Sequence, residues 1–137
     1  MYPKELVQPM KEELTKVGFE DLTTPEMVNN TIKGTEGTLL LVINSVCGCA
    51  AANARPAAIA STQHAKHPTN LMTVFAGVDN AAVAKAREYT FPFPPSSPSI
   101  GLFKDGKLVH FLERHQIEGK TAKMVADNLV AAYEEYC

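Results

Sequence analysis

Two cysteines separated by one glycine are the residues of this sequence best suited to chemistry. Cys47, Gly48 and Cys49 stand between an apolar run that ends at Asn44 and an alanine-rich run that begins at Ala50. A thiolate is the nucleophile in disulfide exchange, and two thiols this close can exchange within one molecule. The spacing therefore predicts thiol–disulfide chemistry. A metal site and a pair of inert, buried thiols are the alternatives.

A helix beginning directly after these cysteines would favour the thiolate form. The free N–H groups and positive partial charge of a helix N-terminus stabilise an anion. We expect Cys47 to lie nearest that terminus and face solvent, and Cys49 to lie deeper in the first turn. Gly48 should allow a tight turn, because a side chain there would add strain and block a substrate. One intervening residue makes a strained disulfide ring, which favours an oxidant or isomerase over a strong reductant.

Composition narrows the setting of this chemistry. The 137 residues suit one domain, with 45% hydrophobic and 20% charged residues and a net charge of -2. Lysine and arginine form no large cluster, so binding to nucleic acid is not expected. The longest apolar run, residues 39–43, is too short to span a membrane, and the charged N-terminus does not resemble a signal peptide. These features predict a cytoplasmic protein, in which a permanent structural disulfide is not expected.

The metal alternative requires more ligands than the cysteine pair supplies. A closed zinc site takes four ligands, and the pair provides two. His64 and His67 could complete the set, but they lie a whole helix away in the sequence. Redox exchange with no cofactor beyond a Cys47–Cys49 disulfide is therefore the favoured interpretation. A binding module that carries a metal or cluster remains the alternative, and metal analysis of the purified protein separates the two.

The order of elements predicts an α/β fold. A strand–helix–strand unit followed by a hairpin at Asp105-Gly106 gives a mixed sheet sandwiched by helices, with the cysteines at the carboxyl end of a central strand. The prediction is a single domain over residues 1–137, with an extra helical extension over about 1–34. The expected strands are 38–44, 71–77, 99–103 and 108–112, and the expected helices are 3–17, 23–34, 50 to about 64 (kinked at Pro56), 81 to about 89, and 119–135.

This order, with cysteines at the first strand-to-helix turn, resembles the thioredoxin fold. The resemblance implies that Pro98 in "SSPS" is a cis-proline facing the site, which would leave the Ser97 backbone free to pair with an extended substrate. The run "TLLLVIN" has Leu41 at about the place where thioredoxins carry a buried acid. A proton must then come from solvent or a nearby loop, for which Glu113 and His115 are candidates. Both could instead merely cap the last helix.

A more specific resemblance extends over nearly the whole chain. The segments "NSVCGCAAANARPA", "TVFAG", "PSSPS", "VHF" and "RHQIEG", with a cysteine at position 137, are similar to the bacilliredoxins. The resemblance implies a thiol–disulfide oxidoreductase that removes a low-molecular-weight thiol, bacillithiol, from mixed disulfides on cytosolic proteins. Cys47 would attack the mixed disulfide and Cys49 would resolve the intermediate. A reductase would recycle the enzyme, and disulfide isomerase activity is also ascribed to the family.

Two further residues have open roles. Arg55 follows the cysteines and could bind a carboxylate of the small thiol, or could be a solvated helix charge. Cys137 could be inert, could join a partner, or could form a disulfide with the active site. A monomer and a homodimer are both compatible with the sequence.

Overall fold

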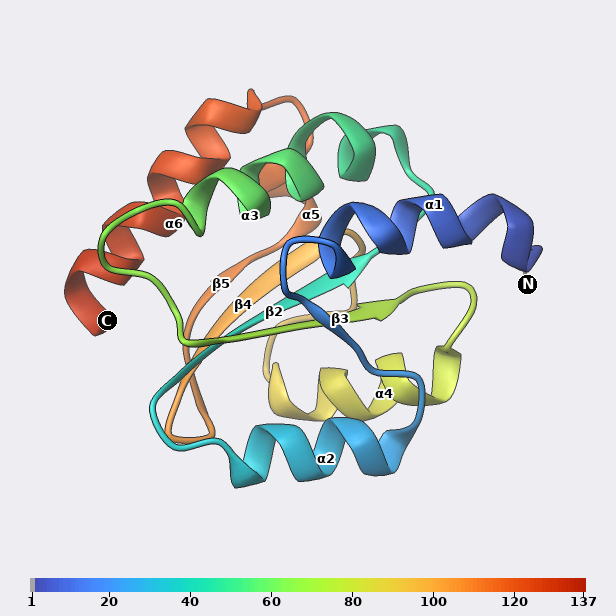
Figure 1. Ribbon diagram of the computed structural model, residues 1–137, viewed down its shortest axis with the longest axis horizontal. Coiled ribbons are helices and arrows are strands. Elements are labelled where there is room, and N and C mark those ends of the chain that lie inside the picture. The colour runs from blue at the N-terminus through green and yellow to red at the C-terminus, as the bar shows by residue number, and fades with distance from the viewer. Residues whose placement is uncertain (1) are drawn as a thin grey trace.

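The computed structural model describes residues 2–137 and contains a five-stranded mixed sheet between two layers of helices (Figure 1). Within those residues, no helix has both the length and the apolar character needed to cross a membrane. The elements in chain order are α1 (Lys4–Thr15), β1 (Glu20–Asp21), α2 (Pro25–Gly34), β2 (Thr38–Asn44), the π-helical turn η1 (Ala50–Ala54), α3 (Arg55–Ser61), β3 (Asn70–Phe75), α4 (Asn80–Tyr89), β4 (Ser99–Lys104), β5 (Lys107–Leu112), α5 (Arg114–Ile117) and α6 (Ala122–Tyr136).

The sheet has the strand order β1-β3-β2-β4-β5. Strands β1, β3 and β2 are parallel, whereas β4 runs antiparallel to β2 and β5 runs antiparallel to β4. It follows that β5 runs in the same direction as β2, so both strands end at the same edge of the sheet. The predicted α/β fold with a mixed sheet is confirmed.

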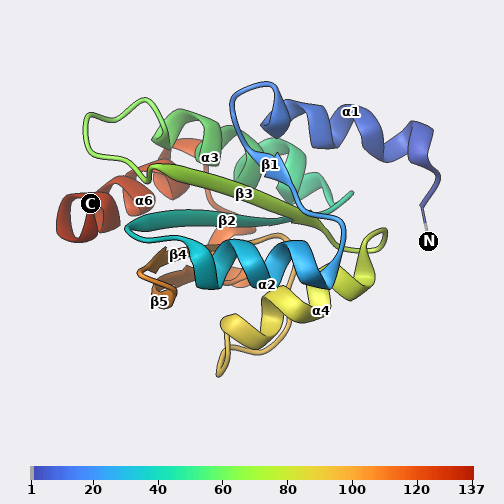
Figure 2. The ribbon, with the colours of Figure 1, turned by 60° about the horizontal axis from the view of Figure 1, so that its bottom comes forward.

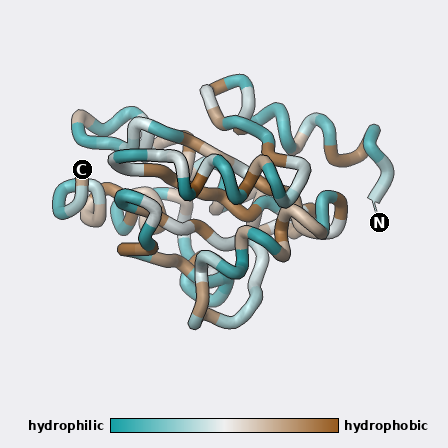
Figure 3. Tube along the Cα trace, turned by 90° about the horizontal axis from the view of Figure 1, so that it is seen from below, coloured by the Kyte–Doolittle hydropathy of each residue, from teal (hydrophilic) through white to brown (hydrophobic). Residues whose placement is uncertain are grey.

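Strand β2 lies at the centre of the sheet and is buried along its whole length. Leu40 and Val42 pack on the layer that contains α1, α3 and α6, whereas Leu39, Leu41 and Ile43 pack on the layer that contains α2 and α4 (Figure 2). The hydrophobic residues accordingly follow the inner part of the chain trace, as Figure 3 shows. Each fully buried side chain of this kind contributes about 2 kcal/mol. A one-residue slip of β2 would exchange the two faces, so its register and its carboxyl end are strongly specified.

The first 34 residues differ from the predicted helical extension. The two-residue strand β1 separates α1 from α2 and pairs with β3 at the edge of the sheet. Neither the length nor the acidic composition of Glu20 and Asp21 indicates a strand. Lys11 of α1 is only 8% exposed and forms ion pairs with Asp21 of β1 at 3.1 Å and with Asp79, directly before α4, at 2.7 Å. The pair with Asp79 joins the N-terminal segment to the rest of the fold. The N-terminal segment is therefore part of the sheet and of both helical layers.

The structure adds one helix to those predicted and divides another. The expected last helix over 119–135 is observed as α6, which begins at Ala122, and the short helix α5 before it was not predicted; Gly119, with a positive φ of 79°, separates the two. The expected helix over 50–64 begins with η1, in which the N–H of Arg55 donates to the carbonyl of Ala50. This widened turn directly precedes Pro56, which has no N–H to donate to a regular helical hydrogen bond.

The side chain of Arg55 joins three elements beneath the end of β2. Its Nη1 donates to Asn44 Oδ1 at 2.9 Å and to the carbonyl of Ser45 at 3.0 Å, and its Nε lies 3.1 Å from a carboxylate oxygen of Glu13 in α1. Arg55 is 1% exposed, so these hydrogen bonds compensate for water that burial removes from Nε and Nη1. Asn44 also donates to the carbonyl of Met10 at 3.3 Å. The network holds the end of β2, the start of α3 and the helix α1 together.

We expect Arg55→Met to lower the free energy of unfolding by about 3 kcal/mol, the usual cost of breaking a buried polar network. Methionine fills similar space, but the Ser45 carbonyl and the Glu13 carboxylate lose their partner. Urea unfolding measures the change. The exposed substitution Lys33→Met on α2 is the control and should change stability by less than about 0.5 kcal/mol. Equal losses of unfolding free energy in the two variants would show that the hydrogen bonds of Arg55 do not stabilise the fold.

Candidate active site

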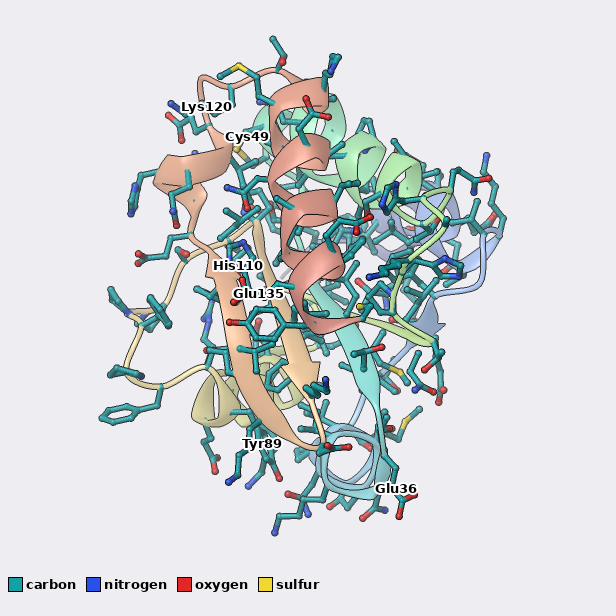
Figure 4. The ribbon with its side chains drawn as sticks, turned by 90° about the vertical axis from the view of Figure 1, so that its left-hand side faces the viewer. Glu36, Cys49, Tyr89, His110, Lys120 and Glu135 are labelled. Atoms are coloured by element: carbon teal, nitrogen blue, oxygen red, sulfur yellow. The ribbon has the colours of Figure 1, made fainter. Side chains whose placement is uncertain are left out.

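The two cysteines stand where β2 gives way to the following helix. Helical structure begins at Gly48 and Cys49, and the carbonyl of Cys47 accepts the N–H of Ala50 at 2.9 Å. Cys47 is thus the residue that caps the helix N-terminus, as its predicted position requires. Both thiols are free and both residues are half-buried. Figure 4 shows Cys49 near Lys120, at the end of the molecule far from Glu36.

The surroundings of Cys47 favour its thiolate. A hydrogen bond from the Cys49 thiol lowers the pKa of Cys47, and the backbone N–H groups of Cys49 and Ala50 and the positive charge of Arg114 act in the same direction. Partial burial opposes these effects but does not outweigh them. Cys47 is therefore the better nucleophile of the pair at a given pH.

The surroundings of Cys49 favour its protonated form. Burial raises the pKa of Cys49, and the hydrogen bond to Cys47, the negative charge on that residue and the carboxylate of Glu118 raise it further. Arg114 opposes the shift without reversing it. The proton of the pair thus stays on Cys49 while Cys47 ionises. This asymmetry suits one attacking and one resolving thiol.

Arg114 is the charged residue of the site that the sequence analysis did not identify. It is the first residue of α5, directly beyond β5, and it lines a cavity of about 380 Å³ together with Cys47 and Ser97. Its Nε donates to Glu118 at 2.7 Å, and its Nη1 donates to the carbonyl of Ser97 at 3.3 Å. A signal existed in the sequence: two strands that run the same way end at one edge, so the residue after β5 must lie near the cysteines.

Glu113 and His115 are not placed against the sulfur atoms. Glu113 caps the short helix α5 through a reciprocal pair with Gln116, and its carboxylate lies 3.2 Å from the His115 ring. His115 lines a neighbouring hollow that Cys47 does not line. The expected capping role is thus observed for Glu113, but on α5 and not on the last helix. Glu118 is the carboxylate that influences Cys49.

The segment before β4 faces the cysteines from across the cavity. The Ser97–Pro98 peptide bond is cis, which confirms that prediction, and Pro98 is buried while Ser97 lines the cavity with Cys47. The expectation that the Ser97 backbone is free is only partly met, because Arg114 occupies its carbonyl. A second cis bond, Phe91–Pro92, lies earlier in the same loop and was not predicted.

Two expectations about residues near the cysteines are wrong. Arg55 cannot bind a ligand and is not a solvated charge, because it is 1% exposed and its donors are directed to Asn44, Ser45 and Glu13. A side chain at Gly48 would not add strain. The residue is exposed, its φ lies outside the left-handed region, and a Cβ would meet no described atom within 4 Å. Gly48 therefore leaves the approach to the sulfurs open without being required by the backbone.

Cys137 lies at the wrong end of the molecule to pair with the active-site cysteines. Partial burial of the thiol raises the pKa of Cys137, and a hydrogen bond with the neighbouring Thr38 hydroxyl partly opposes that shift. Thr38 begins β2, whereas the cysteines follow the other end of this seven-residue strand. Seven residues of strand span about 20 Å, whereas the Cα atoms of a disulfide lie within about 7 Å. The expected alternative of an intramolecular disulfide with the site is therefore wrong.

The ligands considered for a metal do not meet. His64 lies beyond the end of α3, opposite to its cysteine end, and its ring contacts Glu134 at 2.6 Å. The ring of His67 contacts the carbonyl of His64 at 2.8 Å. Among residues 2–137, no group of three or more His, Cys, Asp or Glu side chains is arranged to hold a metal ion.

We expect iodoacetamide to label Cys47 at lower pH than Cys49, because only the thiolate reacts and the pKa of Cys47 is the lowered one. Arg114→Gln removes a nearby positive charge and should move the Cys47 labelling curve to higher pH. Lys33→Gln, at an exposed position on α2, is the charge-matched control and should leave it in place. Peptide mass spectrometry across a pH series measures both sites. Faster labelling of Cys49 throughout would reverse the assignment.

Gly48→Ala should leave the fold intact. We expect stability to be unchanged or higher by about 0.5 kcal/mol, because alanine costs less backbone entropy than glycine in a helical turn. Exchange with a small disulfide should continue, whereas exchange with a protein disulfide should slow because the methyl group narrows the approach. Urea unfolding and parallel exchange assays test this. A loss of more than about 1 kcal/mol would mean that the backbone requires glycine here.

The fold has counterparts of known structure among the thioredoxins. The thioredoxin of Malassezia sympodialis matches with a TM-score of 0.59 and 13% identity, over 87% of this chain and 90% of that one. The oxidised thioredoxin of Plasmodium falciparum matches with a TM-score of 0.59 and 13% identity, over 85% of this chain and 98% of that one. At this level of identity the likeness shows the fold, and it confirms the predicted thioredoxin-like architecture.

The comparison of sequences covers almost the whole chain. A family model described as "Disulphide isomerase" matches residues 2–137. A bacilliredoxin of Cytophaga hutchinsonii is 60% identical over 135 residues, which cover 98% of this chain and 99% of that protein. Bacilliredoxin BH1716 of Halalkalibacterium halodurans is 54% identical over 136 residues, which cover 99% and 94% respectively. The chain belongs to the bacilliredoxin family, a thioredoxin-fold family of thiol–disulfide oxidoreductases.

Proposed function

We propose that this protein removes a low-molecular-weight thiol, such as bacillithiol, from mixed disulfides on cytosolic proteins. Cys47 is the attacking thiol and Cys49 is the resolving thiol. The observation that carries the proposal is the opposite shift of the two pKa values within one helix turn. Membership of the bacilliredoxin family supports the substrate class.

In the first step the thiolate of Cys47 attacks a sulfur of the mixed disulfide. A new S–S bond forms at Cys47 while the old S–S bond breaks, and the departing thiolate takes a proton from water. If the small-thiol sulfur is attacked, the client protein leaves reduced and the small thiol remains on Cys47. The helix N-terminus and Arg114 favour the thiolate before attack.

In the second step Cys49 displaces the group bound to Cys47. Once Cys47 is in a disulfide it carries no negative charge, so one cause of the raised Cys49 pKa disappears. The Cys49 thiolate attacks the Cys47 sulfur, the Cys47–Cys49 disulfide forms, and the small thiol leaves as a thiolate. The client disulfide has gained two electrons and the protein has lost two. A reductase, or two molecules of a small thiol that leave as their disulfide, must return these two electrons.

Disulfide isomerisation is a second candidate supported by the same asymmetry. An isomerase must hold a mixed disulfide with its client long enough for another client thiol to attack it. Burial, the largest cause of the raised Cys49 pKa, remains when Cys47 is in a mixed disulfide, so it keeps a larger fraction of the Cys49 thiol protonated and slows the escape reaction. The description of the matching family model agrees with this candidate. Recovery of activity from a scrambled protein substrate tests it.

We expect Cys49→Ala to accumulate a mixed disulfide that Cys47→Ala does not form. Without Cys49 the intramolecular exit is lost, and well-placed intramolecular groups act at effective concentrations of about 10⁵ M or more. The adduct should therefore persist until an external thiol is added. Non-reducing gels and intact mass after incubation with a thiolated model protein measure the trap. The mass also tells whether Cys47 carries the small thiol or the client.

Cys137→Ala is the matched control, because this thiol lies at the opposite end of β2. It should exchange and recycle as the unmodified chain does. Equal trapping by Cys47→Ala and Cys49→Ala would make the two roles interchangeable. Full activity with trapping by neither variant would rule out the dithiol mechanism.

A further inference from the structure

We propose that the cavity beside Cys47 recognises the carboxylate of the small thiol, and that Arg114 is the residue that binds it. The inference rests on the proposed function, since it names what the exchange site recognises in its substrate. The carboxylate ligand considered for Arg55 is thereby assigned to a different cation, on a different element and at a different place. Three features of the cavity carry the assignment: its charge, its walls and its size.

The charge of the cavity is set by one residue. The residues that line it are Tyr2, Ser45, Val46, Cys47, Ala76, Gly77, Ser97 and Arg114. Among these, Arg114 alone has a side chain that is permanently charged. Because Cys47 lines this space, a disulfide with one sulfur at Cys47 can direct one of its substituents into it. A substituent with a negative group would meet a cation there, whereas a positively charged one would be repelled.

Two hydrogen bonds orient the guanidinium of Arg114 and leave some of its N–H donors available for a ligand. Glu118 holds its Nε at 2.7 Å and the Ser97 carbonyl holds its Nη1 at 3.3 Å, while the backbone N–H of Arg114 donates to the Ser96 hydroxyl at 3.3 Å. Within residues 2–137, Nη2 makes no hydrogen bond that would consume its two donors. Glu118 lies in the adjoining hollow and does not line the cavity. The free side of the fork therefore suits a carboxylate oxygen.

Another part of the cavity wall is built by the N-terminal segment. The N–H of Tyr2 lies 3.4 Å from the carbonyl of Gly77, and the Tyr2 ring rests on the Gly77 backbone, where an added Cβ would come within 2.6 Å of it. Gly77 has a φ of 89°, which glycine adopts readily. The absence of a side chain thus lets the aromatic ring close this side. Tyr2 and Arg114 line the same cavity, whose space would hold the body of a ligand with its carboxylate on the guanidinium.

The size of the cavity selects a small molecule. Its volume of about 380 Å³ lies near the lower end of the range of about 300–1,000 Å³ that small-molecule pockets occupy. A carboxylate on the client protein beside the modified cysteine is the competing source of the same chemistry. A test that changes only the small thiol distinguishes the two sources.

The test uses one model protein with a single cysteine, modified either with glutathione or with glutathione diethyl ester. The ester keeps the disulfide and removes both negative charges. Its two added ethyl groups are the same in every variant, so their effect cancels when the ratios of two variants are compared. The measured quantity is the ratio of kcat/KM for the acid to that for the ester, each divided by its rate with dithiothreitol. We expect the unmodified chain to prefer the acid and Arg114→Gln to lower this ratio about tenfold, the level of one charge-assisted hydrogen bond. Arg114→Lys should keep part of the preference.

The ratio separates ligand binding from the influence of Arg114 on the thiolate. A changed Cys47 pKa alters the rates with the acid and the ester alike, so it cancels. Lys33→Gln on α2 removes an exposed cation elsewhere and should leave the ratio unchanged. Exchange by the unmodified chain and by Arg114→Gln with equal ratios would overturn the assignment of the small-thiol carboxylate to Arg114. The proposed function would then stand. Absence of exchange with both substrates would instead overturn the proposed function.

A binding measurement with a ligand that cannot react tests the inference independently of catalysis. S-methylglutathione cannot exchange, so a titration followed by NMR reports only occupancy of the cavity. We expect saturable shifts of the Gly77 and Ser97 amide signals in the unmodified chain, and at least about fivefold weaker binding in Arg114→Gln. Equal affinity in the two proteins, or shifts confined to other regions, would overturn the inference whatever the exchange assay shows.

Discussion

The buried hydrogen bonds of Arg55 are the constraint on which the position of the reactive thiols depends. A guanidinium without solvent must satisfy its donors within the protein, and here it does so at the end of the central strand and on α1. A shift of Asn44 or Ser45 would leave buried donors of the Arg55 guanidinium without their acceptors. Cys47 follows Ser45 by two residues, so the network that fixes Ser45 also restricts the position of the cysteines. A polar contact that never meets substrate thus supports the chemistry at the surface.

Two identical side chains acquire different acidities from their positions. Cys47 caps a helix and receives N–H groups, whereas Cys49 lies within the first turn and faces the charge of its neighbour. The charges that adjust the pair come from Arg114 and Glu118 on and beside α5, not from an acid beneath the site. Leu41, fully buried in β2, carries no charge beneath the cysteines. The charges that adjust the pKa values of the two thiols therefore lie on an exposed part of the molecule, where a ligand can influence them.

Much of the architecture could be predicted because its causes are local. The continuous apolar run of β2, the Asp105-Gly106 turn and the alternation of strands and helices follow from periodicity and turn chemistry. The break at Gly119 between α5 and α6 and the π turn before Pro56 are also local, but their signals compete with helical patterns on both sides. The sequence carries no local signal for β1, because Glu20 and Asp21 become a strand only through their pairing with β3.

The sequence by itself determined which residues could react: two cysteines one residue apart, after a buried strand and before a helix. The tertiary structure decided what surrounds them. It turned Arg55 inward, carried Arg114 to the cavity from 67 positions beyond Cys47, and placed Cys137 at the far end of β2. The physical reason is that reactivity begins with atom types and short spacings, which a sequence states directly. Charge, burial and proximity depend on how distant segments pack, and only the folded chain brings those segments together.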